Sequence, residues 1–247
     1  MNGRALVLAA HGSTEPGVNE TLHRLARRVG RRLRFDEATA AFHRGDPELS
    51  RALDELRCDD VVVVPLLQSE GYYCDRVLPA ALARNRRFPA LRVRQTPPVG
   101  THPAIGEMLA RRVAELVARH TLETPAVALV AHGTPRHRGS RQAAEATARE
   151  LERRTGLPSR AFFLDEEPAL ELVTGYSSER DLIVVPLLIG AGRHATRDLA
   201  SRLGIDASGG ARALILDRPF GLDPAIEEIV VDLVSSRRSP GAQARTA

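Results

Sequence analysis

The 247-residue chain repeats itself at a constant offset of 121 residues. The matches need no gap, and they run through most of the chain. The matched segments are Ala10–Ser13 with Ala131–Thr134, Phe42 with Phe163, Pro47 with Pro168, Val63–Leu67 with Val184–Leu188, Gly71 with Gly192, Pro98 with Pro219, Gly100 with Gly221 and Pro103 with Pro224. Such a series in one register indicates two copies of one supersecondary unit. We therefore expect two homologous lobes, at residues 1–121 and 122–238, and a flexible tail at 239–247.

Within each copy, the hydrophobic pattern alternates between strand and helix. Ala5–Ala10 is a continuous apolar run, which is typical of a strand buried on both faces. Asn19–Leu33 carries apolar residues at helical spacing, and Asp46-Pro47 is expected to open the next helix with proline at its first position. Further strands are predicted at 38–42, 61–67 and 91–94, and the second copy repeats the pattern from residues 126, 161, 182 and 213. This alternation predicts an α/β fold in which each lobe has a four-stranded parallel sheet flanked by helices, with a cleft between the lobes.

The basic residues are unusual, because all 35 of them are arginine. Arginine binds carboxylates and phosphates in a planar, bidentate manner. Aromatic residues make up only 4% of the chain and tryptophan is absent, so platforms for stacking bases are scarce and we expect no nucleic-acid partner. No apolar run approaches the roughly 20 residues that span a bilayer, and the first ten residues resemble a strand more than a signal peptide. We therefore expect a cytoplasmic protein without a membrane partner, whose two cysteines are ordinary reduced thiols.

Candidate functional residues follow the predicted strands, where parallel sheets collect their ligands. In the second copy the three turns offer His132, then the acidic run Asp165–Glu167, then His194. Two imidazoles and a carboxylate from separate strand ends could form an open divalent-metal site or accept protons near neutral pH. Glu167 is the favoured carboxylate because it occupies the position of Asp46 in the first copy. The alternatives are that each histidine is a structural hydrogen-bonding group and that the acidic run caps the next helix.

The first copy differs at these positions. It has His11 after its first strand, but Tyr73 stands where the second copy has His194. His43 and His102 have no histidine counterpart, and we expect them to serve this lobe. Tyr72 and Tyr73 could pack against a flat ligand or could simply belong to the core.

Several of these motifs together resemble the class II tetrapyrrole chelatases, and in particular the sirohydrochlorin chelatases of the CbiX/SirB type. They are Leu8–Ser13, the Val-Val-Pro-Leu-Leu segment, Gly192–Asp198 and the Pro-x-Gly-x-x-Pro pattern before each copy's last helix. The resemblance covers nearly the whole chain. It implies a chelatase-like fold and an enzyme that inserts Co²⁺ or Fe²⁺, and sometimes Ni²⁺, into sirohydrochlorin or a related tetrapyrrole during cobalamin or siroheme biosynthesis.

The resemblance also implies roles for individual residues. His132, His194 and Glu167 correspond to the metal-handling and proton-handling residues, whereas His11 matches only the first half of the motif. Asp198, four residues after His194, could orient that imidazole or simply favour the start of a helix.

The substrate implied by the resemblance is flat and rich in carboxylates. Arg193 and Arg197 are expected to bind its carboxylates, and Tyr72 and Tyr73 its ring. No nucleotide is expected, because the chain has no GxxxxGK[ST] motif. A monomer is expected, since the fused repeat supplies what single-copy relatives obtain by dimerising. The alternative function is a non-catalytic carrier of metal or tetrapyrrole, which the loss of one histidine pair would explain.

Overall fold

The computed structural model describes residues 3–13, 17–86, 90–134, 138–176, 181–189, 193–204 and 213–236, with the backbone alone at 193–197. Contacts divide them into two compact units. The first unit contains the described residues up to His102 and those from Pro224 onward, and the second contains Pro103–Asp223. The tail predicted at 239–247 lies outside the described residues. Among the described helices, none is both long and apolar enough to cross a membrane.

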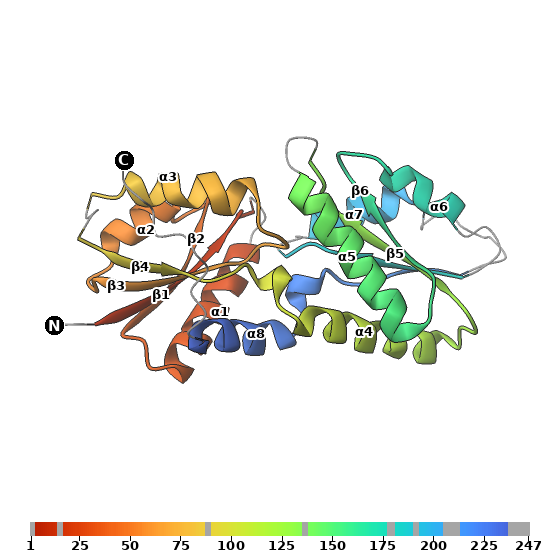
Figure 1. Ribbon diagram of the computed structural model, residues 1–247, viewed down its shortest axis with the longest axis horizontal. Helices are drawn as coiled ribbons and strands as arrows, with labels where there is room; N and C mark the ends of the chain where they lie inside the picture. Colours follow the sequence, from red (N-terminus) through yellow and green to blue (C-terminus); the bar gives the residue numbers. More distant parts are fainter. Residues whose placement is uncertain are drawn as a thin grey trace. The chain divides into compact units, whose positions relative to one another are not determined.

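The first unit is built on a four-stranded parallel sheet, as predicted, with helices on both faces (Figure 1). Its elements are β1 (Arg4–Ala10), α1 (Val18–Arg32), β2 (Glu37–Phe42), α2 (Leu49–Glu55), β3 (Asp60–Pro65), a π-helical turn (Tyr73–Val77), α3 (Leu78–Ala83), β4 (Arg92–Gln95) and α8 (Ala225–Ser235). The strand order is β2-β1-β3-β4. The chain therefore changes direction across the sheet between β1 and β3, and open parallel sheets bind ligands outside the carboxyl ends of such strands.

The apolar periodicity of α1 explains how this helix packs. Leu22, Leu25, Ala26 and Val29 are buried and fall at helical spacing, so they form one stripe. Leu33, predicted as part of that stripe, instead follows the helix as its C-cap and donates its N–H to the carbonyl of Val29.

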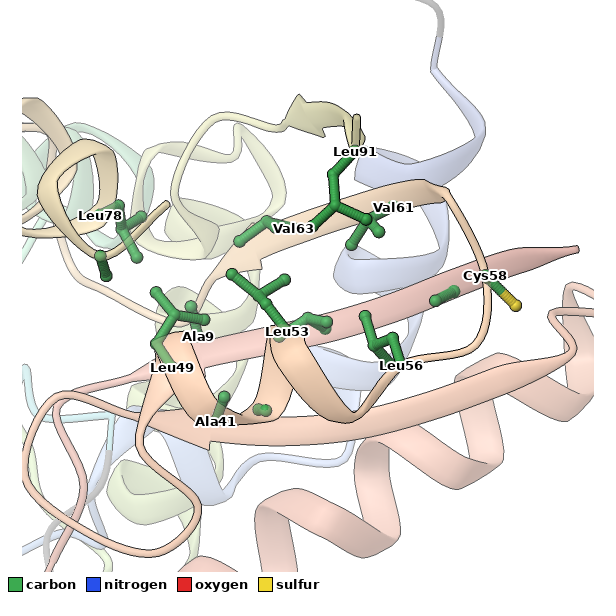
Figure 2. Packing of buried hydrophobic residues seen from close by; sticks show 14 of the residues in the cluster. Ala9, Ala41, Leu49, Leu53, Leu56, Cys58, Val61, Val63, Leu78 and Leu91 are labelled. Atoms are coloured by element: carbon green, nitrogen blue, oxygen red, sulfur yellow. The ribbon is translucent and has the colours of Figure 1, made fainter. Parts of the chain in front are cut away.

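Figure 2 shows the core of the first unit between the sheet and α2. Leu49 and Leu53 of α2 pack with Ala9 of β1 and with Val61 and Val63 of β3. Alternate strand residues contribute because successive side chains point to opposite faces. Fully burying one such leucine or valine stabilises the fold by roughly 1.5–3 kcal/mol, so this layer fixes the strands that carry the site.

The second helix of the first unit begins later than predicted. α2 starts at Leu49, not at Pro47. Glu48 is extended, and the chain before it is tied to the sheet because Phe42 donates its N–H to the carbonyl of Pro47 and forms a parallel bridge with Glu48. Proline at this position therefore belongs to a turn along the edge of the sheet and not to the first turn of a helix.

The second unit repeats this architecture. Its sheet is parallel, with the order β6-β5-β7-β8. Its elements are α4 (Ala104–His120), β5 (Ala126–Ala131), α5 (Arg138–Thr155), β6 (Ser159–Phe163), α6 (Val173–Tyr176), β7 (Leu182–Pro186), α7 (Arg193–Arg202) and β8 (Leu214–Leu216). The predicted α/β fold with one four-stranded parallel sheet per unit is thus confirmed.

Each unit contains the last helix of the other sequence copy. α4 ends the first copy, yet it packs with α5 in the second unit, whereas α8 ends the second copy and packs with α1 and β3 in the first. The units therefore differ from the lobes predicted at 1–121 and 122–238 by one helix each. Helical periodicity identifies the buried face of a helix, but it cannot tell which of two similar sheets covers that face.

A charged network holds α4 in the second unit. The carboxylate of Asp223, whose side chain is fully buried, lies 3.4 Å from Nη2 of Arg111 and 3.9 Å from Nε of Arg112. Arg112 also donates to Asp217, and Arg218 lies 3.3 Å from Asp223. Burial lowers the pKa of Arg112, but the two carboxylates act against this and keep the guanidinium charged.

The equivalent contact in the first unit has the opposite polarity. His102 occupies the place of Asp223, and its Nε2 lies 2.8 Å from Oδ2 of Asp232 on α8. Asp232 is the repeat equivalent of Arg111, and Leu233 is the equivalent of Arg112. The carboxylate of the contact thus lies on the loop in the second unit and on the helix in the first.

Candidate functional site

The first turn after β1 and after β5 places a histidine at the carboxyl end of each sheet. His11 and His132 are both exposed there. The following glycines have left-handed backbones, with φ of 88° at Gly12 and 73° at Gly133. A Cβ on Gly12 would also lie 2.0 Å from the carbonyl oxygen of Arg44. Any residue other than glycine at the second position of the His-Gly turn would therefore be strained.

In the second unit the structure brings His132 and Asp165 together. Nδ1 of His132 lies 3.6 Å from Oδ2 of Asp165, and both side chains are largely exposed. The backbone explains this arrangement, because the N–H groups of Leu164 and Asp165 both donate to the carbonyl of His132. An imidazole next to a carboxylate can act as a general base or as a metal ligand. In either role, the carboxylate helps to fix the orientation of the ring.

The other two carboxylates of the acidic run have different partners. Glu166 accepts a hydrogen bond from the N–H of Thr134 at 3.0 Å, and its Oε2 lies 2.9 Å from Nη2 of Arg141. The predicted ligand Glu167 is exposed and accepts a hydrogen bond from the N–H of Ala169 at 3.0 Å. Glu166 therefore supports the turn, and Glu167 caps the chain leading into the next element.

The remaining predicted residues of this unit lie on α7. His194, Arg193 and Arg197 belong to its first turns, but their side chains lie outside the described part of the structure. Asp198, one turn after His194, is described and exposed. Among the side chains that the structure does describe, no group of three or more His, Cys, Asp or Glu is placed to hold a metal ion.

In the first unit, a histidine pair and a tyrosine meet at the carboxyl end of the sheet. The ring centroids of His11 and His43 lie 5.8 Å apart, and those of His43 and Tyr73 lie 5.7 Å apart with the rings perpendicular. Tyr73 donates its hydroxyl proton to the carbonyl of Ala10 at 2.9 Å. Burial raises the pKa of Tyr73, so this phenol stays protonated.

The two tyrosines have different environments. Tyr73 packs on the hydrophobic core, which favours the core interpretation for its ring. Tyr72 is 65% exposed and therefore does not belong to the core. That Tyr72 packs against a flat ligand stays a prediction.

The Pro-x-Gly-x-x-Pro pattern anchors the loop after the third strand of each unit. Gly100 donates its N–H to the carbonyl of Leu67 at 2.8 Å, and Gly221 donates to Leu188 at 3.2 Å. A Cβ on Gly221 would lie 2.1 Å from the carbonyl oxygen of Ile189, and Gly100 is equally close to Gln68. The glycine of this motif therefore allows two backbone segments to come into contact, a role that the pattern alone does not reveal.

Sequence reasoning also missed Arg141. Its guanidinium bonds Glu166 and lies 5.3 Å above the ring of Phe163, so it fixes the acidic turn from α5. No sequence signal distinguishes Arg141 from the many other arginines on the helices.

Comparison with known proteins gives consistent matches. The family model described as CbiX matches residues 5–116 and again 126–237, at the same offset as the internal repeat. A curated relative, the probable sirohydrochlorin cobaltochelatase of Halobacterium salinarum, is 31% identical over 220 residues, which are 79% of this chain and 75% of that protein.

Solved structures share the fold. CbiX, described as the terminal enzyme for biosynthesis of siroheme in denitrifying bacteria, matches with a TM-score of 0.74 at 22% identity and covers 96% of this chain and 100% of its own. SirB from Bacillus subtilis, solved with Fe³⁺, matches with a TM-score of 0.76 at 16% identity and covers 94% of each chain.

Proposed function

The chain belongs to the CbiX family, and from this premise we propose that it is a metal chelatase that inserts a divalent ion into sirohydrochlorin or a closely related tetrapyrrole. The proposal can be assigned to particular atoms because His132 lies beside Asp165 at the carboxyl end of the second sheet.

The position of Asp165 gives the two nitrogens of His132 different tasks. Nδ1 faces the carboxylate, so the favoured neutral tautomer carries its proton there. Nε2 then carries the lone pair that can bind a metal ion or accept a proton. We assign Nε2 of His132 to the incoming metal ion or to a proton leaving the macrocycle.

Metal insertion requires a base, because the macrocycle loses two pyrrole N–H protons as the divalent ion enters. His132 can accept the two protons one after the other, and the adjacent Asp165 stabilises the imidazolium that forms each time. The exposed position of both groups allows the proton to pass on to water. We therefore give Asp165 the carboxylate role that the sequence analysis assigned to Glu167.

We extend the proposal to the residues of α7 on the strength of the family motif. His194 is the second imidazole for the metal, and Arg193 and Arg197 bind carboxylates of the substrate. Imidazole and carboxylate donors suit Co²⁺, Fe²⁺ and Ni²⁺, and we propose Co²⁺ or Fe²⁺ as the physiological ion.

The test is a metallation assay with purified protein, sirohydrochlorin and Co²⁺ or Fe²⁺, followed by the absorbance change of the macrocycle. We expect His132→Ala to lower the rate about 100-fold or more, because it removes the base. We expect Asp165→Asn to lower the rate about 10-fold to 100-fold by disturbing the orientation of His132. His120→Ala, at the exposed end of α4, is the matched control and should keep the full rate.

A full rate in His132→Ala would contradict the assignment of the base. Stoichiometric binding of sirohydrochlorin by the wild-type chain, with no rate above the uncatalysed reaction, would favour the carrier alternative. A larger loss in Glu167→Gln than in Asp165→Asn would return the carboxylate role to Glu167.

A further inference from the structure

We propose that the first unit binds a small organic dianion, a phosphate monoester or a dicarboxylate, in a cavity between Arg4 and Arg94. The cavity has a volume of about 520 Å³ and is lined by Arg4, by Leu33 and Phe35 after α1, by Arg94 of β4 and by Val234–Ser236 at the end of α8. Arg4 is the first residue of β1, whereas His11 follows the last, so the cavity lies at the other end of that strand from the histidine turn. The inference concerns binding without metal or tetrapyrrole, and it does not depend on chelatase activity.

The sheet places both arginines on one face. Arg4 pairs with Asp60 of β3, and Arg94 pairs with Val62, two residues farther along the same strand. Residues two apart on a strand point to the same face of a sheet, and so do paired residues of neighbouring strands. The two guanidinium groups therefore extend from the same face, with β3 between the strands that carry them.

Both guanidinium groups have contacts that hold them in place. Nη2 of Arg94 donates to the carbonyl of Val234 at 2.7 Å, at the end of α8. The central guanidinium carbon of Arg4 lies 4.6 Å from the centre of the Phe35 ring, and the N–H of Arg4 donates to Asp36 at 2.8 Å. A ligand therefore meets cations that are already positioned, which lowers the entropic cost of binding.

The carboxylates near the cavity leave part of its positive charge unbalanced. Among the residues that the structure describes, Arg94 forms no ion pair, and its hydrogen bonds go to backbone carbonyls. Arg4 lies 3.9 Å from Asp60, and both of these side chains are exposed. Burial lowers the pKa of Arg94, and the charge of Arg4 lowers it further, so an anion between the two cations would relieve their repulsion.

The sequence beyond α8 offers no acidic side chain to these arginines. The segment that follows Ser236 adds Arg237, Arg238 and Arg245, but it contains neither Asp nor Glu. An anionic partner for the cavity is therefore expected to come from outside the chain.

The second unit shows that the fold does not require these arginines. Pro125 and Ile215 are the repeat equivalents of Arg4 and Arg94. The pairing of β8 with β7 keeps the register of β4 with β3, so the positions compare directly. The pair of cations thus belongs to the first unit and not to the shared architecture.

The helices that end each copy differ at the same place. α8 ends at Ser235, whereas α4 continues past the equivalent Ala114 to His120. The early end of α8 contributes Val234–Ser236 to the lining of the cavity. A shorter helix and two added cations at one place point to a binding site.

The lining defines the class of ligand. A guanidinium binds a carboxylate or a phosphate through two parallel hydrogen bonds, so a pair of them favours a ligand with two negative charges. Leu33, Phe35 and Val234 provide an apolar wall for the rest of the molecule. Sites for small molecules typically have volumes of roughly 300–1,000 Å³, and this cavity falls in that range.

The test is isothermal titration calorimetry on the full chain, at low ionic strength and without metal, with phenyl phosphate and phthalate as probes. We expect one molecule of at least one probe to bind per chain, and added salt to weaken the binding. The tighter probe identifies the anionic group as a phosphate or as a pair of carboxylates. Benzyl alcohol, which has the ring without the charge, should show no saturable binding.

Variants of the two arginines assign the binding to this cavity. Arg94→Ile, which installs the residue of the second unit, should weaken binding about tenfold or more, because a charge-assisted hydrogen bond to the ligand is lost. Arg4→Gln should have a similar effect, and it leaves the contact of Arg94 with α8 intact if Arg94→Ile does not fold. Arg51→Ile, an exposed arginine in the first turn of α2, removes the same charge outside the cavity and should keep the full affinity.

NMR locates the bound probe independently of the variants. The amide signals of Phe35 and Ser236 should shift during the titration, whereas those of Gly12 and Gly133 in the His-Gly turns should not. The proposal would be overturned by the absence of saturable binding of both probes or by equal binding of benzyl alcohol. Unchanged affinity in folded Arg4→Gln, or shifts confined to the His-Gly turns, would also overturn it.

Discussion

Replacing Arg112 by leucine should destabilise the protein by about 3–5 kcal/mol, the range found when one member of a buried ion pair is removed. The side chain of Arg112 is 3% exposed, and its partners Asp217 and Asp223 are 10% and 0% exposed. The variant therefore leaves two carboxylates in the interior with less compensating charge. Leucine itself fits this helix position, because Leu233 occupies the equivalent place on α8.

Transferring four of the equivalent residues from the first unit should recover most of this loss. The quadruple variant is Arg111→Asp, Arg112→Leu, Asp217→Thr and Asp223→His, which copies Asp232, Leu233, Thr96 and His102. It exchanges the buried ion pairs as a group, and such exchanges are close to neutral or even stabilising. We expect a free energy of unfolding within about 2 kcal/mol of the wild type.

Urea unfolding at 25 °C, followed by circular dichroism, measures both effects. Arg119→Leu, on the exposed face of the same helix, is the control and should change the free energy of unfolding by less than about 0.5 kcal/mol. The reasoning is refuted if Arg112→Leu costs less than about 1 kcal/mol. It is also refuted if the quadruple variant is no more stable than the single one.

Three further predictions follow from the packing. Gly221→Ala should cost roughly 1–3 kcal/mol in thermal unfolding, because its Cβ would meet the carbonyl of Ile189, whereas Gly175→Ala in α6 has open space and should be neutral or slightly stabilising. Burial raises the pKa of the Cys74 thiol to about 12, so the folded protein should resist a thiol reagent at pH 8, and rapid labelling of Cys74 would contradict its burial. Burial lowers the pKa of His23, so the free energy of unfolding should fall as the pH drops through about 6.5, where the unfolded chain takes up a proton first. Urea titrations from pH 7 to pH 5 should show a flatter dependence in His23→Gln, and identical slopes would rule this contribution out.

The repeat allowed the strands and the His-Gly turns to be predicted, because both depend on local pattern. The spacing did not show which of the three consecutive carboxylates lies beside His132. Thr134 and Arg141 bind Glu166, and Ala169 binds Glu167, which leaves Asp165 beside the imidazole of His132. Such choices depend on side-chain partners from distant elements, and spacing in one sequence does not reveal them.

The exchange of helices was equally invisible in the sequence, although its charges are present there. Arg111 and Asp232 occupy equivalent positions with opposite sign, and so do Asp223 and His102 when the imidazole is protonated. The structure is needed to show that these charges pair, because it shows which loop each helix contacts.

Because α4 completes the second unit and α8 completes the first, neither sequence copy carries all the helices of one unit. Loss of the first copy would remove a helix from the unit that contains His132. Evolution can therefore erode the chemistry of the first copy, as the tyrosine in place of the second histidine suggests, but loss of that copy would leave the second unit without α4 unless another copy supplied this helix. A gene split at residue 121 should likewise yield two fragments that form a stable fold only when both are present.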